Sequence, residues 1–285
     1  MKPMILITGA TGTVGKEIVN VLIEQGIYFR ATTRFLNKNY SKIDWYKLNY
    51  NSIESIKNCL VDIQILLLIL PLSTIQVEMA TRIIDVAYLV GVKHIIFLSS
   101  TGSKAIGGPS IGRWHRTVER YIISSGISYT IIRPTTFMQN FLTFYKIENN
   151  EICLPWSNSK ICFIDVRDIA KFIHCIILNL SIHIDKTYTL TSMDNNTMNE
   201  FVEIISEVVS KRIKYKDITL EEFEQKIRSS KIISEDMIIP SLELHEYYYQ
   251  GKHSSPTDDF HYITKINPIS FKEFCTYYKK ELINE

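Results

Sequence analysis

The sequence predicts an α/β fold, a doubly wound parallel sheet followed by a smaller, mostly helical lobe. Before residue 135, apolar segments of strand length alternate with segments of helical periodicity at least five times. This alternation is typical of a parallel sheet covered by helices on both faces. After residue 150 most segments are helical. We therefore expect one domain over residues 1–150, a second over residues 151–285, and a late strand near 186–192 that returns to the first domain.

A local sequence feature predicts each strand and helix of the first domain. Residues 4–7 and 63–70 are apolar on both faces, as central parallel strands are. Residues 28–33 are rich in aromatic and β-branched side chains, which favour strands. Helices are indicated by apolar residues three and four positions apart, and Gly26 and Gly91 end two of them. The predicted order is strand 4–7, a helix ending at Gly26, strand 28–33, helix 52–60, strand 63–70, helix 74–90, strand 94–98, helix 112–125 and strand 128–133.

The second domain contains fewer strands. A short apolar run predicts a strand at residues 162–165, followed by a helix at 166–177 and a strand at 187–191. Helical spacing then predicts four helices, at residues 198–210, 220–229, 240–250 and 270–282.

Composition excludes several classes of protein. Of the 285 residues, 46% are hydrophobic and 22% charged, and the net charge is +2. The chain is therefore neither disordered nor a nucleic-acid binder with a broad basic surface. Its longest apolar stretch, residues 65–70, is far shorter than the roughly 20 residues that cross a bilayer. Five cysteines without a CxxC pair indicate reduced thiols rather than a zinc site. We expect a cytoplasmic protein that binds no metal, membrane or nucleic acid.

A glycine-rich turn joins the first strand to the first helix. In residues 8–15, Gly9, Gly12 and Gly15 have the spacing GxxGxxG. Gly9 permits a tight turn, Gly12 lets the backbone approach a pyrophosphate, and Gly15 lets the helix pack close to the strand. The helix N-terminus offers N–H groups and a positive dipole to phosphate. This context predicts a dinucleotide site.

The end of the second strand indicates which dinucleotide is bound. An NAD enzyme usually has an acidic residue there, which holds the ribose 2′-hydroxyl. This chain has Thr33 and Arg34, with Lys38 after them. A guanidinium can grip a 2′-phosphate with two hydrogen bonds, whereas a carboxylate repels it. The residues favour NADP(H), unless Arg34 is an ordinary solvated surface charge.

Further blocks carry a family resemblance. They are residues 112–115 followed by Glu119, residues 133–140, residues 163–170 and the stretch 248–274. With the glycine turn, they make the chain resemble the atypical short-chain dehydrogenase/reductases, specifically the NmrA-like group. The resemblance covers essentially the whole chain. It implies a Rossmann domain that binds NADP(H) and a small lobe that closes a substrate cleft.

The resemblance also implies roles for individual residues. Asn49 stands where the family often has an aspartate near the adenine. The implied cofactor contacts are Gly9, Thr11, Gly12, Thr13 and Val14 at the pyrophosphate, Arg34 at the 2′-phosphate, Leu70 and Pro71 on the adenosine side, Ser99 and Ser100 near the nicotinamide, and Pro134, Thr135 and Phe137 beneath its ring.

The usual proton donor of short-chain dehydrogenases is absent. Most of them use Tyr-x-x-x-Lys, but here His115 stands at the lysine position and Ile111 at the tyrosine position. Isoleucine cannot transfer a proton. One interpretation is an NADPH-dependent reductase of an iminium, quinone or enone, which needs hydride more than a protein acid. The alternative is a non-enzymatic NADP(H) sensor that acts through a protein partner. An isomerase-like or epimerase-like relative is a third interpretation.

Candidate catalytic and substrate residues follow from these positions. His115 could hydrogen-bond the ribose or relay a proton, or it could be a packed core histidine. Ser100 could orient the substrate beside the nicotinamide, or only cap a turn. Asp165 and Asp168 are interpreted as structural. The candidate substrate residues, which could equally belong to the core of the lobe, are Phe137, Met138, Asn140, Trp156 and Tyr248.

Overall fold

The computed structural model describes residues 4–36, 43–252 and 255–283. The chain forms two compact units that interleave along the sequence, whereas the expected division is at residue 150 with one late strand returning to the first domain. The first unit comprises Met1–Ser103, Trp114–Arg133 and Ile169–Tyr188. The second comprises Lys104–Arg113, Pro134–Asp168 and Thr189–Glu285.

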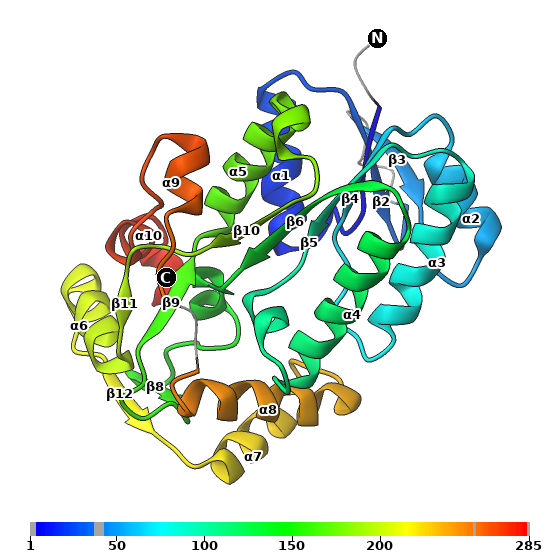
Figure 1. The fold of residues 1–285 in the computed structure, drawn as a ribbon. Helices are drawn as coiled ribbons and strands as arrows, with labels where there is room; N and C mark the ends of the chain where they lie inside the picture. Colours follow the sequence, from blue (N-terminus) through cyan, green and yellow to red (C-terminus); the bar gives the residue numbers. More distant parts are fainter. Residues whose placement is uncertain (1–3, 37–42, 253–254, 284–285) are drawn as a thin grey trace. The chain divides into compact units, whose positions relative to one another are not determined.

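A seven-stranded sheet forms the centre of the first unit (Figure 1). Its order is β10 (Lys186–Leu190), β6 (Ser128–Pro134), β5 (His94–Leu98), β4 (Ile65–Leu68), β1 (Ile5–Ile7), β2 (Phe29–Thr33) and β3 (Asp44–Lys47). Each neighbouring pair from β6 to β3 is parallel. The predicted doubly wound parallel fold is thereby confirmed. The strand expected near residues 186–192 is β10, which lies beside β6.

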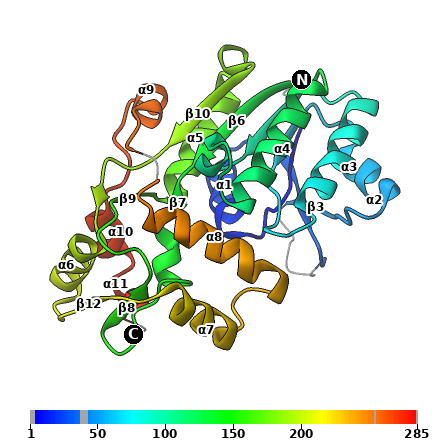
Figure 2. The same cartoon turned by 60° about the horizontal axis from the view of Figure 1, so that its bottom comes forward.

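Helices cover both faces of this sheet. On one face, α2 (Ile53–Leu60), α3 (Gln76–Leu89) and α4 (Ser110–Ser124) share a hydrophobic cluster with the strands. On the other face lie α1 (Thr13–Glu24) and α5 (Val166–Leu178), as Figures 1 and 2 show. This arrangement follows from right-handed crossovers that move in opposite directions from β1. It leaves the carboxyl ends of the strands as the edge where ligands bind in such sheets.

The second unit combines short strands with helices. Its three-stranded sheet has the order β11 (Asn195–Asn196), β9 (Ile161–Ile164) and β7 (Thr136–Phe137), and β8 (Glu151–Leu154) pairs with β12 (Lys214–Asp217). The short 3₁₀ helix η2 (Met138–Leu142) follows β7 directly. The helices are α6 (Met198–Val209), α7 (Leu220–Ser230), α8 (Ile238–Tyr249), α9 (Asp259–Thr264), α10 (Phe271–Tyr277) and α11 (Lys279–Leu282).

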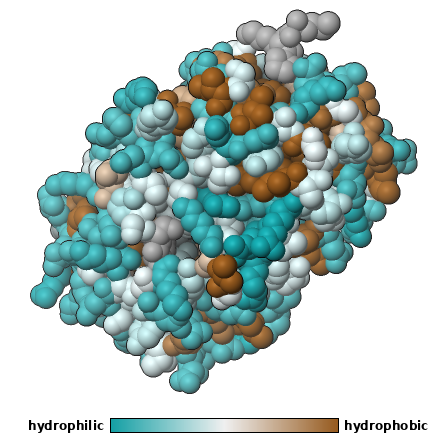
Figure 3. Space-filling model, viewed as in Figure 1, coloured by the Kyte–Doolittle hydropathy of each residue, from teal (hydrophilic) through white to brown (hydrophobic). Residues whose placement is uncertain are grey.

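Local sequence signals start several of these helices. Thr197, Thr219 and Ser270 each form a capping box with the glutamate three residues later, at the starts of α6, α7 and α10. The helices enclose an aromatic core in which rings meet edge to face, for example Phe141 with Phe271 at 4.9 Å between ring centroids. On the face shown in Figure 3, polar residues cover most of the surface and apolar residues gather in smaller areas.

Candidate active site

The turn between β1 and α1 has the geometry of a phosphate-binding loop. Gly9 has φ +62°, a left-handed conformation, and a Cβ there would lie 2.9 Å from the Ile69 carbonyl oxygen. A Cβ on Gly15 would lie only 2.1 Å from the Gly9 carbonyl oxygen, so the helix approaches the turn as closely as glycine permits. The Gly12 amide donates to the Gly9 carbonyl at 3.0 Å and closes the turn.

The N-terminus of α1 is free to bind an anion. Gly12 is its N-cap, and no side chain of the described residues caps it or places a negative charge in its first turn. Thr11, Gly12 and Thr13 are exposed, while Val14 is buried. The first N–H groups of the helix and its positive dipole are therefore available to a pyrophosphate.

The two arginines of the second strand region have different environments. Arg30 is buried, donates to the carbonyls of Cys59 (2.8 Å) and Val61 (3.0 Å), and serves the fold. Arg34 follows the strand and is exposed. The Thr33 hydroxyl, which donates to the Phe35 carbonyl at 3.1 Å, shapes the turn that carries Arg34. Lys38 lies outside the described residues.

Leu70 and Pro71, the residues expected on the adenosine side, follow a segment that Thr8 holds in place. The Thr8 hydroxyl accepts from the Ile69 amide at 2.8 Å, which fixes the segment that leads to half-buried Leu70 and exposed Pro71. The Asn49 side chain accepts from the Asn51 amide at 3.0 Å, so its oxygen serves a local turn. Burial raises the pKa of the neighbouring Tyr50 to about 12. No sequence signal singled out this residue.

A buried carboxylate organises the ends of β5 and β6. Glu119 of α4 accepts from the hydroxyls of Ser99 (2.5 Å) and Ser103 (2.7 Å) and pairs twice with Arg133 (2.9 and 2.6 Å). Burial alone raises the pKa of Glu119, but these hydrogen bonds outweigh burial and hold it below its usual value. The Ser99 hydroxyl is thus committed to the fold. Sequence reasoning used Glu119 only as a family marker, because its partners are 14 to 20 residues away.

His115 lies one helical turn before Glu119. Its ring contacts Phe97 at 5.8 Å between centroids. Burial lowers the pKa of His115 to about 4, against the opposing effect of Glu119, so the imidazole is neutral at pH 7. Its buried Nδ1 finds no hydrogen-bond partner among the residues that the structure describes. Ser100 is half-buried, and its carbonyl accepts from the Ser103 amide at 3.1 Å.

In the second unit, Pro134 at the end of β6 and the residues that follow it are partly buried and partly accessible. Pro134 and Thr135 are buried, and the Thr135 hydroxyl donates to the Cys162 carbonyl at 2.9 Å. Phe137 and Asn140 are half-buried.

The remaining substrate candidates lie deeper. Trp156 and Met138 are 0% exposed and Tyr248 is 7% exposed, all within the hydrophobic cluster of the second unit. This burial favours a role in the core over direct contact with a substrate.

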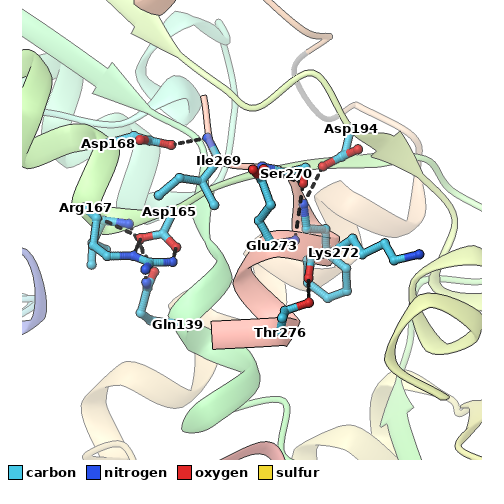
Figure 4. A network of polar contacts seen from close by, with 12 residues as sticks. Gln139, Asp165, Arg167, Asp168, Asp194, Ile269, Ser270, Lys272, Glu273 and Thr276 are labelled. Atoms are coloured by element: carbon cyan, nitrogen blue, oxygen red, sulfur yellow. Dashed lines mark hydrogen bonds and ion pairs between the residues drawn. The ribbon is translucent and has the colours of Figure 1, made fainter. Parts of the chain in front are cut away.

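Gln139 connects this segment to the next motif, as Figure 4 shows. Its amide nitrogen donates to Asp165 at 2.9 Å, and its amide oxygen accepts from the Val166 backbone at 3.1 Å. Arg167 pairs with Asp165 at 2.6 Å and lies 4.2 Å from the centre of the Tyr277 ring.

Asp168 accepts from the Ile269 amide at 2.6 Å and fixes the start of the C-terminal helices (Figure 4). Both aspartates therefore hold the second unit together.

The part of the chain that the structure describes contains neither a candidate metal site nor a candidate membrane span. Its residues contain no group of three or more histidine, cysteine or acidic side chains placed to hold a metal ion. Among the helices of the same residues, none has the length and apolarity needed to cross a membrane.

The fold and the glycine turn define a doubly wound α/β protein of the Rossmann type. Within that class, the chain belongs to the NmrA-like family, whose model matches residues 1–274. This match confirms the resemblance found in the sequence.

Two curated relatives have enzyme names. An NAD(P)H azoreductase from Xenophilus azovorans is 28% identical over 228 residues, which cover 78% of this chain and 79% of that protein. An agroclavine dehydrogenase from Claviceps fusiformis is 28% identical over 235 residues, which cover 79% of this chain and 80% of that protein.

Solved structures show the same fold. An NADPH-dependent quinone oxidoreductase from Escherichia coli, in complex with NADPH, has a TM-score of 0.84 at 20% identity and covers 97% of this chain and 100% of its own. The negative transcriptional regulator NmrA, in complex with NADP, has a TM-score of 0.79 at 14% identity and covers 99% of this chain and 98% of its own.

Proposed function

We propose that this protein is an NADPH-dependent reductase that transfers hydride to a small unsaturated organic substrate. The observation that carries the proposal is the β1–α1 turn, where a helix N-terminus without a capping side chain follows a turn whose close contacts require glycine. The names of the two curated relatives, an azoreductase and a dehydrogenase, support the same reaction class.

The residues of this chain fit the dinucleotide. The backbone of Gly9, Thr11, Gly12, Thr13 and Val14 would hold the pyrophosphate, and exposed Arg34 would hold the 2′-phosphate.

Further along the dinucleotide, Leu70 and Pro71 would border the adenosine, and Ser99 would shape the nicotinamide end through Glu119. Pro134, Thr135 and Phe137 would pass beneath the ring. NADPH supplies the hydride when bound.

His115 and Ser100 are the proposed catalytic residues. A buried ring nitrogen without a partner is costly, and a ribose hydroxyl that reached His115 Nδ1 would satisfy it. Because burial keeps the pKa of His115 near 4, the imidazole accepts or donates one hydrogen bond without carrying charge at pH 7. The half-buried Ser100 hydroxyl would orient the substrate. Iminium, quinone and enone acceptors all fit a site without Tyr-x-x-x-Lys.

The first test is a fluorescence titration of the purified protein with NADPH, NADP⁺, NADH and NAD⁺, followed by an acceptor screen that monitors NADPH absorbance. We expect the tightest binding for NADPH, much weaker binding for NADH, and NADPH oxidation with at least one acceptor class. Preference for the oxidised forms, or no effect of the 2′-phosphate, would contradict the reductase.

A second candidate is an NADP(H) sensor that acts through a protein partner. It is favoured by Ile111, which replaces the expected proton donor, and by the shared fold with an NADP-bound transcriptional regulator. A sensor distinguishes NADP⁺ from NADPH in the same titration, leaves NADPH unoxidised with every acceptor, and buries part of its surface against a partner.

A further inference from the structure

The first unit has a pocket between the C-terminal ends of two neighbouring helices. α3 and α4 lie side by side in Figures 1 and 2, and the Tyr121 phenol joins them by donating to the Asp85 carboxylate at 2.5 Å. The pocket has a volume of about 470 Å³, within the range of roughly 300–1,000 Å³ that is typical of small-molecule sites. We call it the helix-end pocket; it is lined by Ile84, Asp85, Tyr88, Leu89, Tyr121, Ser124 and Ser125.

The helix-end pocket and the glycine turn lie at opposite edges of one sheet. Four residues separate the end of α3 from the start of β5, and three separate the end of α4 from the start of β6. The pocket is therefore near the amino ends of these parallel strands, whereas the glycine turn follows the carboxyl end of β1. All of its lining residues belong to the first unit. A ligand of this pocket is thus a different molecule from the dinucleotide.

Two helix C-termini contribute negative potential to the pocket. The C-terminal end of an α-helix carries about half a negative charge, and a cation nearby is stabilising. Neither α3 nor α4 has a basic residue in its last turn. The hydroxyls of Ser124 and Ser125 donate to the carbonyls of Tyr121 (3.0 Å) and Ile122 (2.6 Å). These contacts satisfy two carbonyls at the end of α4 without adding positive charge.

Asp85 adds a full negative charge at the same place. Its carboxylate accepts from Tyr121, and no lysine or arginine of the described residues pairs with it. The hydrogen bond to Asp85 raises the pKa of Tyr121, so the phenol stays neutral. No basic side chain belongs to the lining that the described residues form. The pocket therefore combines one carboxylate with two negative helix ends, and nothing in its lining balances them.

The rest of the lining is aromatic and apolar. Tyr88 is three positions after Asp85 and four after Ile84, so the three side chains share one face of α3. Tyr88 is 62% exposed, and Leu89 in the same turn is also exposed. A tyrosine ring attracts a cation through its π electrons, and the apolar side chains suit hydrocarbon. The lining thus fits a ligand that has both a positive centre and an apolar body.

We propose that the helix-end pocket binds an organic cation with an apolar body, of the class of tertiary amines and quaternary ammonium compounds. The positive nitrogen lies against the Asp85 carboxylate and the two helix ends, and the hydrocarbon part lies against Tyr88 and Leu89. An anion would be repelled by the same groups. A hard metal ion needs several oxygen ligands, and a single carboxylate supplies too few. The assignment does not depend on the proposed reductase function.

The test is a calorimetric titration with benzyltrimethylammonium, and N-benzylacetamide is the uncharged comparison. Asp85→Asn removes the charge but keeps an acceptor for Tyr121. Asp62→Asn is its matched control, because Asp62 is exposed in the same unit and its φ of +59° suits asparagine. Tyr88→Leu removes one ring, and Tyr28→Leu, at 60% exposure in the same unit, is its control.

We expect benzyltrimethylammonium to bind at least about tenfold more tightly than N-benzylacetamide at low salt, and added salt should weaken it. Asp85→Asn should weaken binding of the cation roughly fivefold, the upper end for an accessible ion pair. Tyr88→Leu should weaken it about threefold through the lost cation–π contact. Neither control should change it.

Backbone amide chemical shifts locate the bound cation. Gly91 and Gly126 come directly after the ends of α3 and α4, each separated from its helix by one residue. Their amide resonances should shift during the titration with benzyltrimethylammonium. The resonance of Gly12, in the glycine turn at the other edge of the sheet, should not.

Several results would overturn the proposal. If benzyltrimethylammonium does not bind, or N-benzylacetamide binds as tightly, the pocket does not select a cation. Equal losses in Asp85→Asn and Asp62→Asn would mean that only the net charge matters. Shifts at Gly12 without shifts at Gly91 and Gly126 would place the cation elsewhere. Self-association that Tyr88→Leu abolishes, with no cation bound, would make this face a contact between copies. The reductase proposal fails separately, in the titration with NADPH.

Discussion

At the scale of single residues, burial decides whether a polar side chain serves the fold or a ligand. Arg30 and Arg34 are four positions apart, yet Arg30 is enclosed by backbone carbonyls and the Tyr46 ring, 4.1 Å from its guanidinium carbon, while Arg34 is exposed. The sequence identified Arg34 because its position at the end of the second strand is sufficient to mark it as a candidate for the 2′-phosphate. It could not choose between core and substrate wall for Trp156, because an aromatic side chain suits either environment until its neighbours are known.

Arg34 offers the clearest prediction for a single residue. Arg34→Glu should reverse the cofactor preference, because a carboxylate repels the 2′-phosphate and accepts from a ribose 2′-hydroxyl. A charge-assisted hydrogen bond contributes about 1.5–3 kcal/mol, so we expect a loss of roughly 10- to 100-fold in NADPH affinity. Fluorescence titration measures it. Arg212→Glu, an exposed change of the same charge in the second unit, is the control. An unchanged preference in Arg34→Glu would mean that another residue contacts the 2′-phosphate.

At the scale of elements, the sequence predicted those strands and helices whose own residues carry the signal. The central strands β1 and β4 are continuous apolar runs, β5 is apolar after His94, and all of their residues are buried. The edge strand β3 was missed because it is short, has a charged residue at each end and is only partly buried. The pair β8 and β12 was also missed, because its parallel pairing joins segments about 60 residues apart. Only the folded chain brings such segments together.

The β1–α1 turn gives a prediction at this scale, because Gly15 and Gly12 are required for different purposes: Gly15 for packing of the helix and Gly12 for the approach of the pyrophosphate. Gly15→Ala places a methyl group 2.1 Å from the Gly9 carbonyl oxygen, which must displace α1. Such overpacking costs about 1–3 kcal/mol, and we expect a lower Tm in thermal unfolding.

Gly12→Ala is the contrasting variant. Its Cβ would lie 3.2 Å from the Gly9 carbonyl oxygen, and φ of −78° suits alanine. We expect Tm within a few degrees of the unmodified protein but at least about tenfold weaker NADPH binding, because the methyl group occupies the approach of the pyrophosphate. If Gly12→Ala binds NADPH normally, the pyrophosphate does not contact this turn.

At the scale of the whole molecule, the sequence predicted the doubly wound sheet and the late strand that returns to it, but not the other exchanges of chain between the two units. Local patterns report elements one at a time, whereas the units are defined by which elements pack together. The Glu119 network shows the same limit within the candidate site, since it joins β5, β6 and α4 through side chains that no spacing rule connects. The pKa values of buried histidines are equally hard to predict from the sequence, because distant parts of the chain form their environment.

Three such histidines predict that the protein loses stability in mild acid. Burial lowers the pKa of His94, His115 and His245 to about 4 each, and they lie in both units. The unfolded chain has histidines of pKa near 6.5, so between about pH 6.5 and 4 it binds more protons than the folded chain. Stability is therefore complete above about pH 6.5 and falls as the pH drops, by at most about 1.4 kcal/mol per pH unit for each histidine.

The contribution of one histidine can be isolated. His94 faces the Thr130 hydroxyl at 2.9 Å, and glutamine can keep a hydrogen bond there without titrating. Between about pH 6.5 and 5, where carboxylates of depressed pKa such as Glu119 remain ionised, His94→Gln should flatten the pH dependence of the free energy of unfolding in urea. His261→Gln, at an exposed position, should leave the slope unchanged. Equal slopes in all three proteins would show that His94 is already protonated, or accessible to protons, in the folded state.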